Sequence, residues 1–280
     1  MTKKLSSIII IGILIIGGLF FPDYFEQLSS EDLEVHYIDV GQGDSILIKG
    51  KEKNMLIDAG SNSYSDYLIE YIESQNISSL DYVVATHPHE DHIGSMDEII
   101  DYFDVGKVIM PEVIHTTLAF ENLMDSIDRN GLTITLAKAG ETYDLNEAQA
   151  RILAPIGDSY SNLNNYSVVV KLINGENSFL FTGDAEGLSE DEMVNRDYKS
   201  LNSDVLKLGH HGSSTSTTED FFKAVSPDYA VISVGYKNTY NHPNREIINL
   251  LEDNEVDYYR TDLDGTIVIK SNGENISIKK

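Results

Sequence analysis

The sequence predicts an α+β fold in which two β-sheets face each other, preceded by one apolar N-terminal helix. Three observations predict it. The chain has 280 residues and is 41% hydrophobic, which is enough for one large core, and no Pro/Ser-rich or repetitive stretch interrupts it after position 33. Strand-like and helix-like segments fall into two successive clusters, each with helices after its strands. An apolar run over residues 5–21 follows two lysines.

The apolar run is predicted to be a membrane-spanning signal anchor. At about 1.5 Å per residue its helix is roughly 25 Å long, which is short for crossing a bilayer but longer than the apolar core of a typical signal peptide. No small-x-small cleavage site follows cleanly, which favours an anchor over a cleaved leader. Lysines precede the run and acidic residues follow it, so the N-terminus is expected inside the cell. We expect a single-pass protein of the cell membrane, or a secreted one if the leader is cleaved, with an inner terminus at 1–4, an anchor at 5–21, a polar stalk at 22–33 and an extracellular domain at 34–280.

The first cluster of elements covers roughly the first half of the domain. Residues 41–44, Gly-Gln-Gly-Asp, form a turn between two apolar strands, since glycine permits positive φ and aspartate bonds local backbone. Helical spacing of apolar residues then alternates with short apolar runs. The expected elements are strands over 33–40, 45–49, 55–58 and 81–85, strands near Val108, Ile134 and Ile152, and helices over 64–73, 93–103 and 117–129.

The second cluster repeats the pattern. Strands are expected over 167–173, 178–181, 204–208 and 229–234 and near Tyr258, Ile267 and Ile276, with helices over 188–195, 219–225 and 245–252. Two clusters of this kind suggest two sheets packed face to face between helical layers, although periodicity alone predicts only an α/β or α+β class.

A metal-binding pattern follows the strand at 81–85. Residues 86–94 read Thr-His-Pro-His-Glu-Asp-His-Ile-Gly. In a tight loop His87 and His89 can point one way while Asp91 and His92 turn toward a second point. Mixed imidazole and carboxylate ligands suit a two-metal hydrolytic centre better than a structural zinc site, which usually relies on cysteine, and the chain has no cysteine. The alternative is a solvated His-rich turn.

This pattern resembles the signature of the metallo-β-lactamase superfamily. The closer resemblance is to the hydrolase domain of ComEC-type competence DNA-uptake proteins, and it rests on the segments 39–44 (DVGQGD), 181–186 (FTGDAE), 206–213 (LKLGHHGS) and 260–265 (RTDLDG). The His-His-Gly-Ser element also resembles that of choline-phosphate esterases acting on teichoic acids. The resemblance implies an αββα four-layer sandwich and a centre of two divalent ions, zinc or manganese.

The resemblance also implies roles for individual residues. Asp184 would bridge the two metals, and Asp58 would support the ligand loop from behind. One of His210 and His211 would complete the second metal site, with His211 favoured by the resemblance, and its neighbour would face the substrate. His210 or His242 would assist the leaving group. Ser213 and Ser214 are expected either to bind a phosphate at a helix N-terminus or to cap that helix.

One position departs from the superfamily pattern. Most of its hydrolases place another histidine before the strand that here begins near Ser167, where this chain has Asn162-Leu-Asn-Asn. Asn164 or Asn165 is expected to offer a weak amide oxygen there, and Asn165 is also expected to contact the substrate. The ComEC-like proteins share the substitution, so it does not indicate an inactive enzyme.

These features predict a tethered, metal-dependent phosphodiesterase or nuclease in which a hydroxide held between two cations attacks phosphorus. The expected substrate is a phosphodiester, either single-stranded DNA or a wall polymer. The alternatives are a teichoic-acid or choline-phosphate phosphodiesterase, an acyl or lactam hydrolase, and a non-catalytic metal-binding module. The net charge of −26 works against a broad electrostatic grip on nucleic acid.

The remaining histidines and several tyrosines are not assigned a role in the site. His36 and His115 are interpreted as structural or incidental. The tyrosines 236, 240, 258 and 259 can stack on a base or ring, but with sixteen tyrosines in the chain core packing is the default interpretation.

Overall fold

A computed structural model describes residues 32–280. The predicted anchor and almost all of the predicted stalk lie outside these residues. Within 32–280, no helix combines the length and the apolar character needed to cross a bilayer. Residues 33–280 form one compact unit.

The described residues build two mixed β-sheets, and their strand orders are β15-β14-β1-β2-β3-β4-β5-β6 and β13-β12-β11-β10-β9-β8-β7. We call the eight-stranded sheet A and the seven-stranded one B. Sheet A contains β1 (Leu33–Tyr37), β2 (Ile46–Lys49), β3 (Asn54–Ile57), β4 (Ser79–Val84), β5 (Asp104–Met110), β6 (Ile134–Leu136), β14 (Ile267–Ser271) and β15 (Ile276–Lys279). Sheet B contains β7 (Thr142–Asp144), β8 (Gln149–Ala154), β9 (Val169–Asn174), β10 (Asn177–Phe181), β11 (Val205–Lys207), β12 (Tyr229–Ile232) and β13 (Asp257–Arg260).

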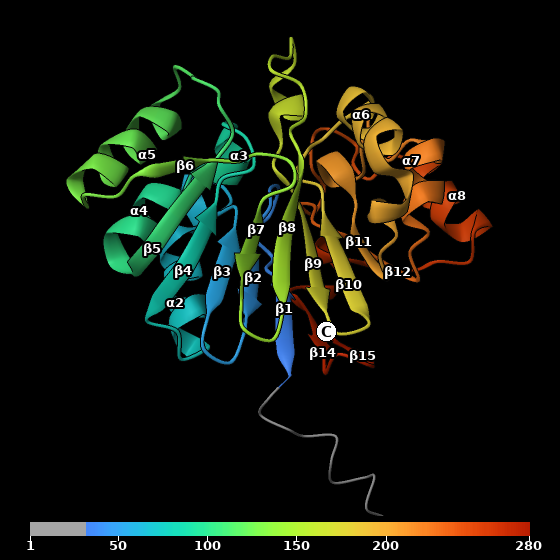
Figure 1. Cartoon of the computed structure of the whole chain (residues 1–280), viewed down its shortest axis with the longest axis horizontal. Helices are drawn as coiled ribbons and strands as arrows, with labels where there is room; N and C mark the ends of the chain where they lie inside the picture. The colour runs from blue at the N-terminus through green and yellow to red at the C-terminus, as the bar shows by residue number, and fades with distance from the viewer. Residues whose placement is uncertain (1–31) are drawn as a thin grey trace, which may run out of the picture. The chain divides into compact units, whose positions relative to one another are not determined.

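Helices cover the outer face of each sheet (Figure 1). On the side of sheet A these are α2 (Ser65–Ser74), α4 (Met96–Tyr102) and α5 (Leu118–Arg129), and on the side of sheet B they are α6 (Gly187–Asp197), α7 (Glu219–Val225) and α8 (Arg245–Asp253). Short helices lie in the loops: η2 (Asn62–Tyr64), α3 (Glu90–Ile93), η3 (Leu163–Tyr166), η4 (Tyr198–Leu201), η5 (Gly209–Gly212) and α9 (Thr261–Asp264). The predicted αββα sandwich is confirmed.

Strand alternation divides the apolar residues into three cores. On β10, Phe179 and Phe181 point between the sheets, where they join Val35 and Tyr37 of β1, while Leu180 faces the helices of sheet B. The third core lies between sheet A and its helices, and Leu47 of β2 belongs to it. The central strands β2 and β10 therefore carry apolar residues on both faces, as expected for sheets covered on both sides.

The structure refines several predicted elements. The helix expected over 93–103 is α4, Met96–Tyr102, and the end of the metal loop before it forms the short helix α3. Gly94 packs so closely between them that a Cβ there would lie 2.4 Å from the backbone nitrogen of Asn62. Strand β7 was not predicted, because a three-residue strand carries too little alternation to be recognised.

Both sheets contain a parallel set of strands, and these sets deliver the polar loops. Strands β3 to β6 are parallel in sheet A, and β10 to β13 are parallel in sheet B. Ligand sites in such sheets form beyond the carboxyl ends of the parallel strands. The segments that follow β3, β4, β10, β11 and β12 contain every residue predicted to bind metal and also Asp58 and His242.

Candidate metal centre

Three polar residues of the centre have an unusual backbone conformation. Asp58 directly follows β3 with a φ of 58°, and His210 and His211 follow β11 with φ of 48° and 55°. Residues other than glycine rarely occupy this left-handed region, and where they do the conformation is often tied to function. The consecutive left-handed residues turn the two histidine side chains in different directions, so only His211 becomes fully buried.

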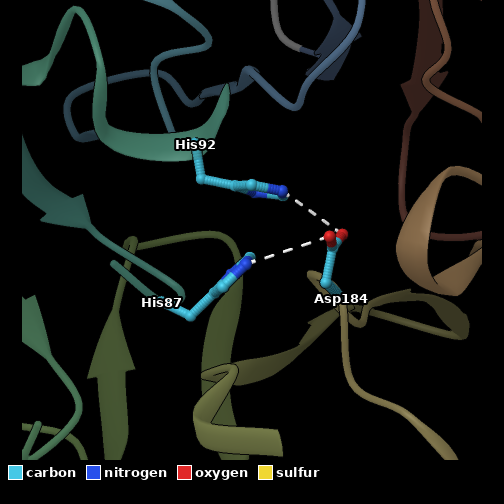
Figure 2. Close-up of side chains that lie close together, drawn as sticks. All are labelled: His87, His92 and Asp184. Atoms are coloured by element: carbon cyan, nitrogen blue, oxygen red, sulfur yellow. Dashed lines mark ion pairs between the residues drawn. The ribbon is translucent and has the colours of Figure 1, made fainter. Parts of the chain in front are cut away.

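The first potential metal position lies at His87 and Asp184, which with His92 form a group compact enough for one ion, while His89 lies beside His87. His87 Nε2 lies 2.9 Å from His89 Nδ1 and 3.8 Å from Asp184 Oδ2. Figure 2 shows the imidazoles of His87 and His92 directed at the Asp184 carboxylate from the opposite sheet. The Nδ1 of His87 faces Thr86 Oγ1 at 3.1 Å, and this contact fixes the ring from behind.

The second potential position is formed by Asp91, His92, His211 and Asp184. His92 Nε2 lies 3.3 Å from Asp184 Oδ1, and His211 Nε2 lies 3.3 Å from Asp91 Oδ2 and 3.6 Å from Asp184 Oδ2. The two oxygens of Asp184 therefore face both positions, which is the geometry expected of a bridging ligand. The geometry also favours His211 over His210 as the metal-binding histidine, because His211 joins Asp91 and His92 in a group compact enough for one ion.

The donor set fits metal ions. Among the described residues, His92 Nε2, His211 Nε2 and Asp184 Oδ1 are buried without a hydrogen-bond partner, and all three point into the centre. Such orphaned groups are costly unless a cation satisfies them. The ligands are imidazole and carboxylate without thiolate, which suits zinc, manganese or iron.

The pKa values of His92, His211 and Asp184 indicate that the carboxylates of the centre favour positive charge beside them. Burial lowers the pKa of His92 and His211, but the carboxylates around them reverse this effect. The pKa of His92 is raised well above its ordinary value, and Asp184, Asp44 and Asp91 raise that of His211 to about 9. Burial opposes ionisation of Asp184, yet the imidazoles of His92 and His211 hold its pKa well below the ordinary value. In the metal-free protein His92 and His211 therefore carry protons where a cation would bind, whereas burial lowers the pKa of His87 well below its ordinary value.

Two groups behind the ligands fix their orientation. Asp58 accepts hydrogen bonds from His92 Nδ1 at 2.7 Å and from Thr86 N at 2.8 Å. This matches the supporting role expected for Asp58. His211 Nδ1 donates to the carbonyl of Ser233 at 3.0 Å. In each case the bonded Nδ1 directs Nε2 toward the centre, which is the usual arrangement for a metal-binding histidine.

A buried ion pair that the sequence did not reveal lies next to the centre. Lys207, the last residue of β11, is fully buried and pairs with Asp44. Its ammonium also donates to the carbonyl of Gly183 at 3.0 Å, directly before Asp184. Asp44 Oδ1 lies 3.4 Å from His211 Nδ1, and the backbone N–H of Asp44 donates to the carbonyl of Asp91. The only signal in the sequence was a lysine within the apolar run at 205–208.

The asparagines before β9 have different roles. Asn165 Oδ1 accepts the backbone N–H groups of Glu186 and Ser189, both at 3.2 Å, so it supports the start of α6 and is not free for substrate. Asn164 Nδ2 donates to Glu186 Oε1 at 3.0 Å, while its buried Oδ1 has no hydrogen-bond partner within residues 32–280. Of the two asparagines, only Asn164 therefore keeps an amide oxygen without a hydrogen-bond partner among the described residues.

A cleft of about 660 Å³ opens over the centre. His89, Asp91, Asp184, His210, His211 and His242 line it, together with Gln42, Ser61, Tyr64, Glu90, Thr117 and Tyr240. The ring centroids of His210 and His242 are 5.4 Å apart, so the two candidates for leaving-group assistance are neighbours. His115 lies beside the loop, with its ring centroid 6.4 Å from that of His89.

Ser213 and Ser214 do not line this cleft. The helix expected over 219–225 is α7, which begins at Glu219 with Thr218 as its N-cap residue, so the serines do not cap it. Ser213 Oγ instead bonds Thr215 Oγ1 at 3.0 Å, and Ser214 N donates to Asn244 Oδ1. The two serines therefore belong to a polar turn, and phosphate binding by them stays a prediction.

Comparison with known proteins identifies the family. Residues 38–236 match the sequence profile of the Metallo-beta-lactamase superfamily. The chain belongs to this superfamily. It is 31% identical to ComE operon protein 3 of Bacillus subtilis over 95% of this chain and 36% of that protein. It is 28% identical to competence protein ComA of Neisseria gonorrhoeae over 86% of this chain and 33% of that protein.

These superfamily members confirm the resemblance to ComEC-type competence proteins. The chain spans about a third of the length of these curated relatives. Among solved structures, the metallo-beta-lactamase fold protein YhfI of Bacillus subtilis has a TM-score of 0.59 at 12% identity, covering 86% of this chain and all of that one. CmlA, a diiron β-hydroxylase from Streptomyces venezuelae, has a TM-score of 0.56 at 15% identity, covering 87% and 54%. At such identities the likeness shows the shared fold alone.

Proposed function

We propose that this protein is a metal-dependent phosphodiesterase, and specifically a nuclease, tethered to the outer face of the cell membrane. The observation that carries the proposal is the set of histidines from both sheets that converge on the two oxygens of Asp184 and offer two adjacent metal positions. Two-metal centres of this kind stabilise both the attacking and the departing oxygen of a phosphodiester. The similarity to competence proteins favours a nucleic-acid substrate over other phosphodiesters.

Within this proposal, the bound cations would be zinc or manganese and would supply the acidified water and the positive charge that hydrolysis requires. The residues of the chain position the reacting groups. Asp58 and Ser233 hold the rings of His92 and His211, and the Lys207 contact to Gly183 holds the loop of Asp184. Such fixed dipoles and ligands stabilise developing charge without reorganisation during the reaction.

His210 is the group best placed to protonate the leaving oxygen. It lines the cleft, its Nε2 lies 3.7 Å from Asp184 Oδ2, and its Nδ1 faces Glu186 Oε1 at 3.2 Å. His242 is less suited, because burial and the imidazoles of His210 and His211 lower its pKa to about 4. Its neutral ring would position the substrate instead.

Membrane tethering rests on the apolar sequence at 5–21, which lies outside the described residues. The positive-inside pattern would place the domain on the outer side, where incoming single-stranded DNA or wall polymers are accessible. The channel activity of a competence protein is not part of the proposal, since the chain matches only about a third of such proteins.

The proposal is tested by hydrolysis assays on metal-stripped protein reloaded with zinc or with manganese. The substrates are bis(p-nitrophenyl) phosphate and single-stranded DNA. We expect both to be cleaved, and we expect Asp184→Ala to abolish cleavage while the circular dichroism spectrum is retained. Asp128→Ala, at an exposed position of α5, is the matched control.

The outcomes separate the alternatives. Cleavage of the small ester alone would redirect the substrate to teichoic-acid or lipid phosphodiesters. Full activity of Asp184→Ala would refute the proposed centre. Absence of cleavage with either metal would favour an acyl hydrolase or a binding module.

A further inference from the structure

The loop after β12 presents exposed aromatic side chains at the rim of the cleft. Tyr240 lines the cleft together with His242, yet 64% of Tyr240 is accessible to solvent. Tyr236, four residues earlier, is 67% exposed. By contrast, Tyr258 and Tyr259 are partly buried in or beside the cores. Core packing thus accounts for the latter two tyrosines and leaves Tyr236 and Tyr240 without an explanation.

The ring of Tyr240 is connected to the metal centre by two histidine rings. Tyr240 stacks on His242 with 5.8 Å between ring centroids and 27° between ring planes. His242 in turn packs edge-on against His210 at 5.4 Å, and His210 Nε2 faces Asp184. A flat ligand on the outer face of Tyr240 would therefore lie a few rings from the position of the reacting phosphate.

Hydrogen bonds hold this loop in one conformation. Asn238 Nδ2 donates to the carbonyls of Gly235 and His242 at 3.0 and 2.6 Å, and its Oδ1 accepts the backbone N–H groups of Tyr240 and His242 at 3.1 and 3.0 Å. Gly235 N donates to Gln42 Oε1 at 3.1 Å, which connects the loop to the opposite wall of the cleft. One side chain thus clamps the backbone on both sides of Tyr240. A preorganised ring loses little entropy when a ligand stacks on it.

We propose that Tyr240 is a stacking site for a nucleobase adjacent to the phosphodiester held at the centre, which makes single-stranded nucleic acid the substrate class. This inference rests on the proposed function. The accessible face of Tyr240 is open and flat, whereas a choline headgroup is recognised by several rings that enclose it. The net charge of −26 works against a broad electrostatic grip on a nucleic-acid backbone, so base stacking would supply affinity that the overall charge does not.

The first test compares two esters with the same leaving group. Thymidine 5′-(p-nitrophenyl phosphate) carries a base next to the scissile phosphate, and methyl p-nitrophenyl phosphate does not. We expect Tyr240→Leu in the metal-loaded full-length protein to lower the ratio of kcat/KM for the thymidine ester over the methyl ester about tenfold, mainly through KM, since stacking of one base contributes on that order. Tyr198→Leu, at an exposed tyrosine of η4 that does not line the cleft, should keep the ratio.

The second test does not depend on turnover. The chain contains no tryptophan, so Tyr240→Trp introduces a single tryptophan at the proposed site, whose emission can be excited apart from that of the tyrosines, and keeps an aromatic face. We expect a thymidine oligomer to quench its fluorescence, and an abasic oligomer of equal phosphate count to quench it at least fivefold less. Tyr240→Trp should also retain the preference for the thymidine ester.

Each outcome decides between the two proposals. An unchanged ester ratio in Tyr240→Leu, or equal quenching by both oligomers, overturns the stacking site while leaving the phosphodiesterase intact. A larger loss of p-nitrophenyl phosphorylcholine turnover than of thymidine ester turnover would also overturn it, in favour of an ammonium site. If the unmodified protein cleaves no ester but the thymidine oligomer selectively quenches Tyr240→Trp, the phosphodiesterase fails and base binding stands.

Discussion

Substitution of Lys207 by methionine tests whether the buried ion pair supports the metal centre. Methionine has a similar length without the charge, so Lys207→Met removes the counter-ion of Asp44 and the donor to the Gly183 carbonyl. Both Lys207 and Asp44 are almost fully buried, so the carboxylate would remain unpaired in the interior. Breaking a buried pair from one side typically costs about 3–5 kcal/mol. We therefore expect the free energy of unfolding of the metal-free protein to fall by about that amount in urea denaturation.

The double variant Asp44→Asn/Lys207→Met separates stability from positioning. It removes both charges together, so most of the lost stability should return. Metal affinity should not return, because the double variant still lacks the bond to Gly183 beside Asp184 and the carboxylate next to His211. Loss of outer contacts of this kind lowers metal affinity about 10- to 100-fold. Manganese binding is measured by isothermal titration calorimetry, with the metal-free melting temperature as the companion reading.

Two results would refute this reasoning. If Lys207→Met unfolds within about 1 kcal/mol of the unmodified protein, the pair does not carry the energy expected of a buried ion pair. If the double variant binds manganese as tightly as the unmodified protein, the pair serves only to fill the interior and does not position the ligands.

Three further predictions follow from the structure. Gly43→Ala should weaken metal binding, because Gly43 has a φ of 139° and a Cβ there would lie 2.2 Å from the carbonyl oxygen of Asp91, which would displace the ligand loop. Gly131→Ala is the control, since a Cβ there meets open space and should leave metal binding unchanged. Calorimetry measures metal binding in both variants. Chelation should lower the melting temperature, and manganese or zinc should restore it, since bound ions stabilise the folded state. Burial raises the pKa of Glu190 from 4.5 to about 7, so its contribution to stability is largest below pH 4.5 and is lost as the pH rises through 7. Between pH 5 and 8 the free energy of unfolding should therefore fall less in Glu190→Gln than in the unmodified protein, and the difference between the two falls should reach up to about 3 kcal/mol.

Local sequence was sufficient to predict the ligand loop and most of the elements. His87, His89, Asp91 and His92 follow an apolar strand in one short motif, and strand alternation is visible over four or more residues. Most strands and helices could be predicted because the ligand motif and the strand alternation are each contained within about ten consecutive residues.

The remaining features depend on conformation or on distant contacts. The left-handed backbone at His210 and His211 decides which ring faces the centre, and strand periodicity carries no information about it. The partner of Lys207 comes from a turn far away in the sequence, so the pair became visible only in the folded chain. Likewise, Asn165 could not be distinguished from Asn164, because their different roles depend on the backbone of α6.

The division of ligands between the sheets has a consequence for the order of events during folding. Sheet A contributes His87, His89, Asp91 and His92, whereas Asp184 and His211 arrive later in the chain and belong to sheet B. A half-made or truncated chain would thus hold only part of the ligand set, and the complete centre forms after the sheets have docked. Metal uptake would then be among the last steps of maturation, and the bound ions would cross-link sheet A to sheet B.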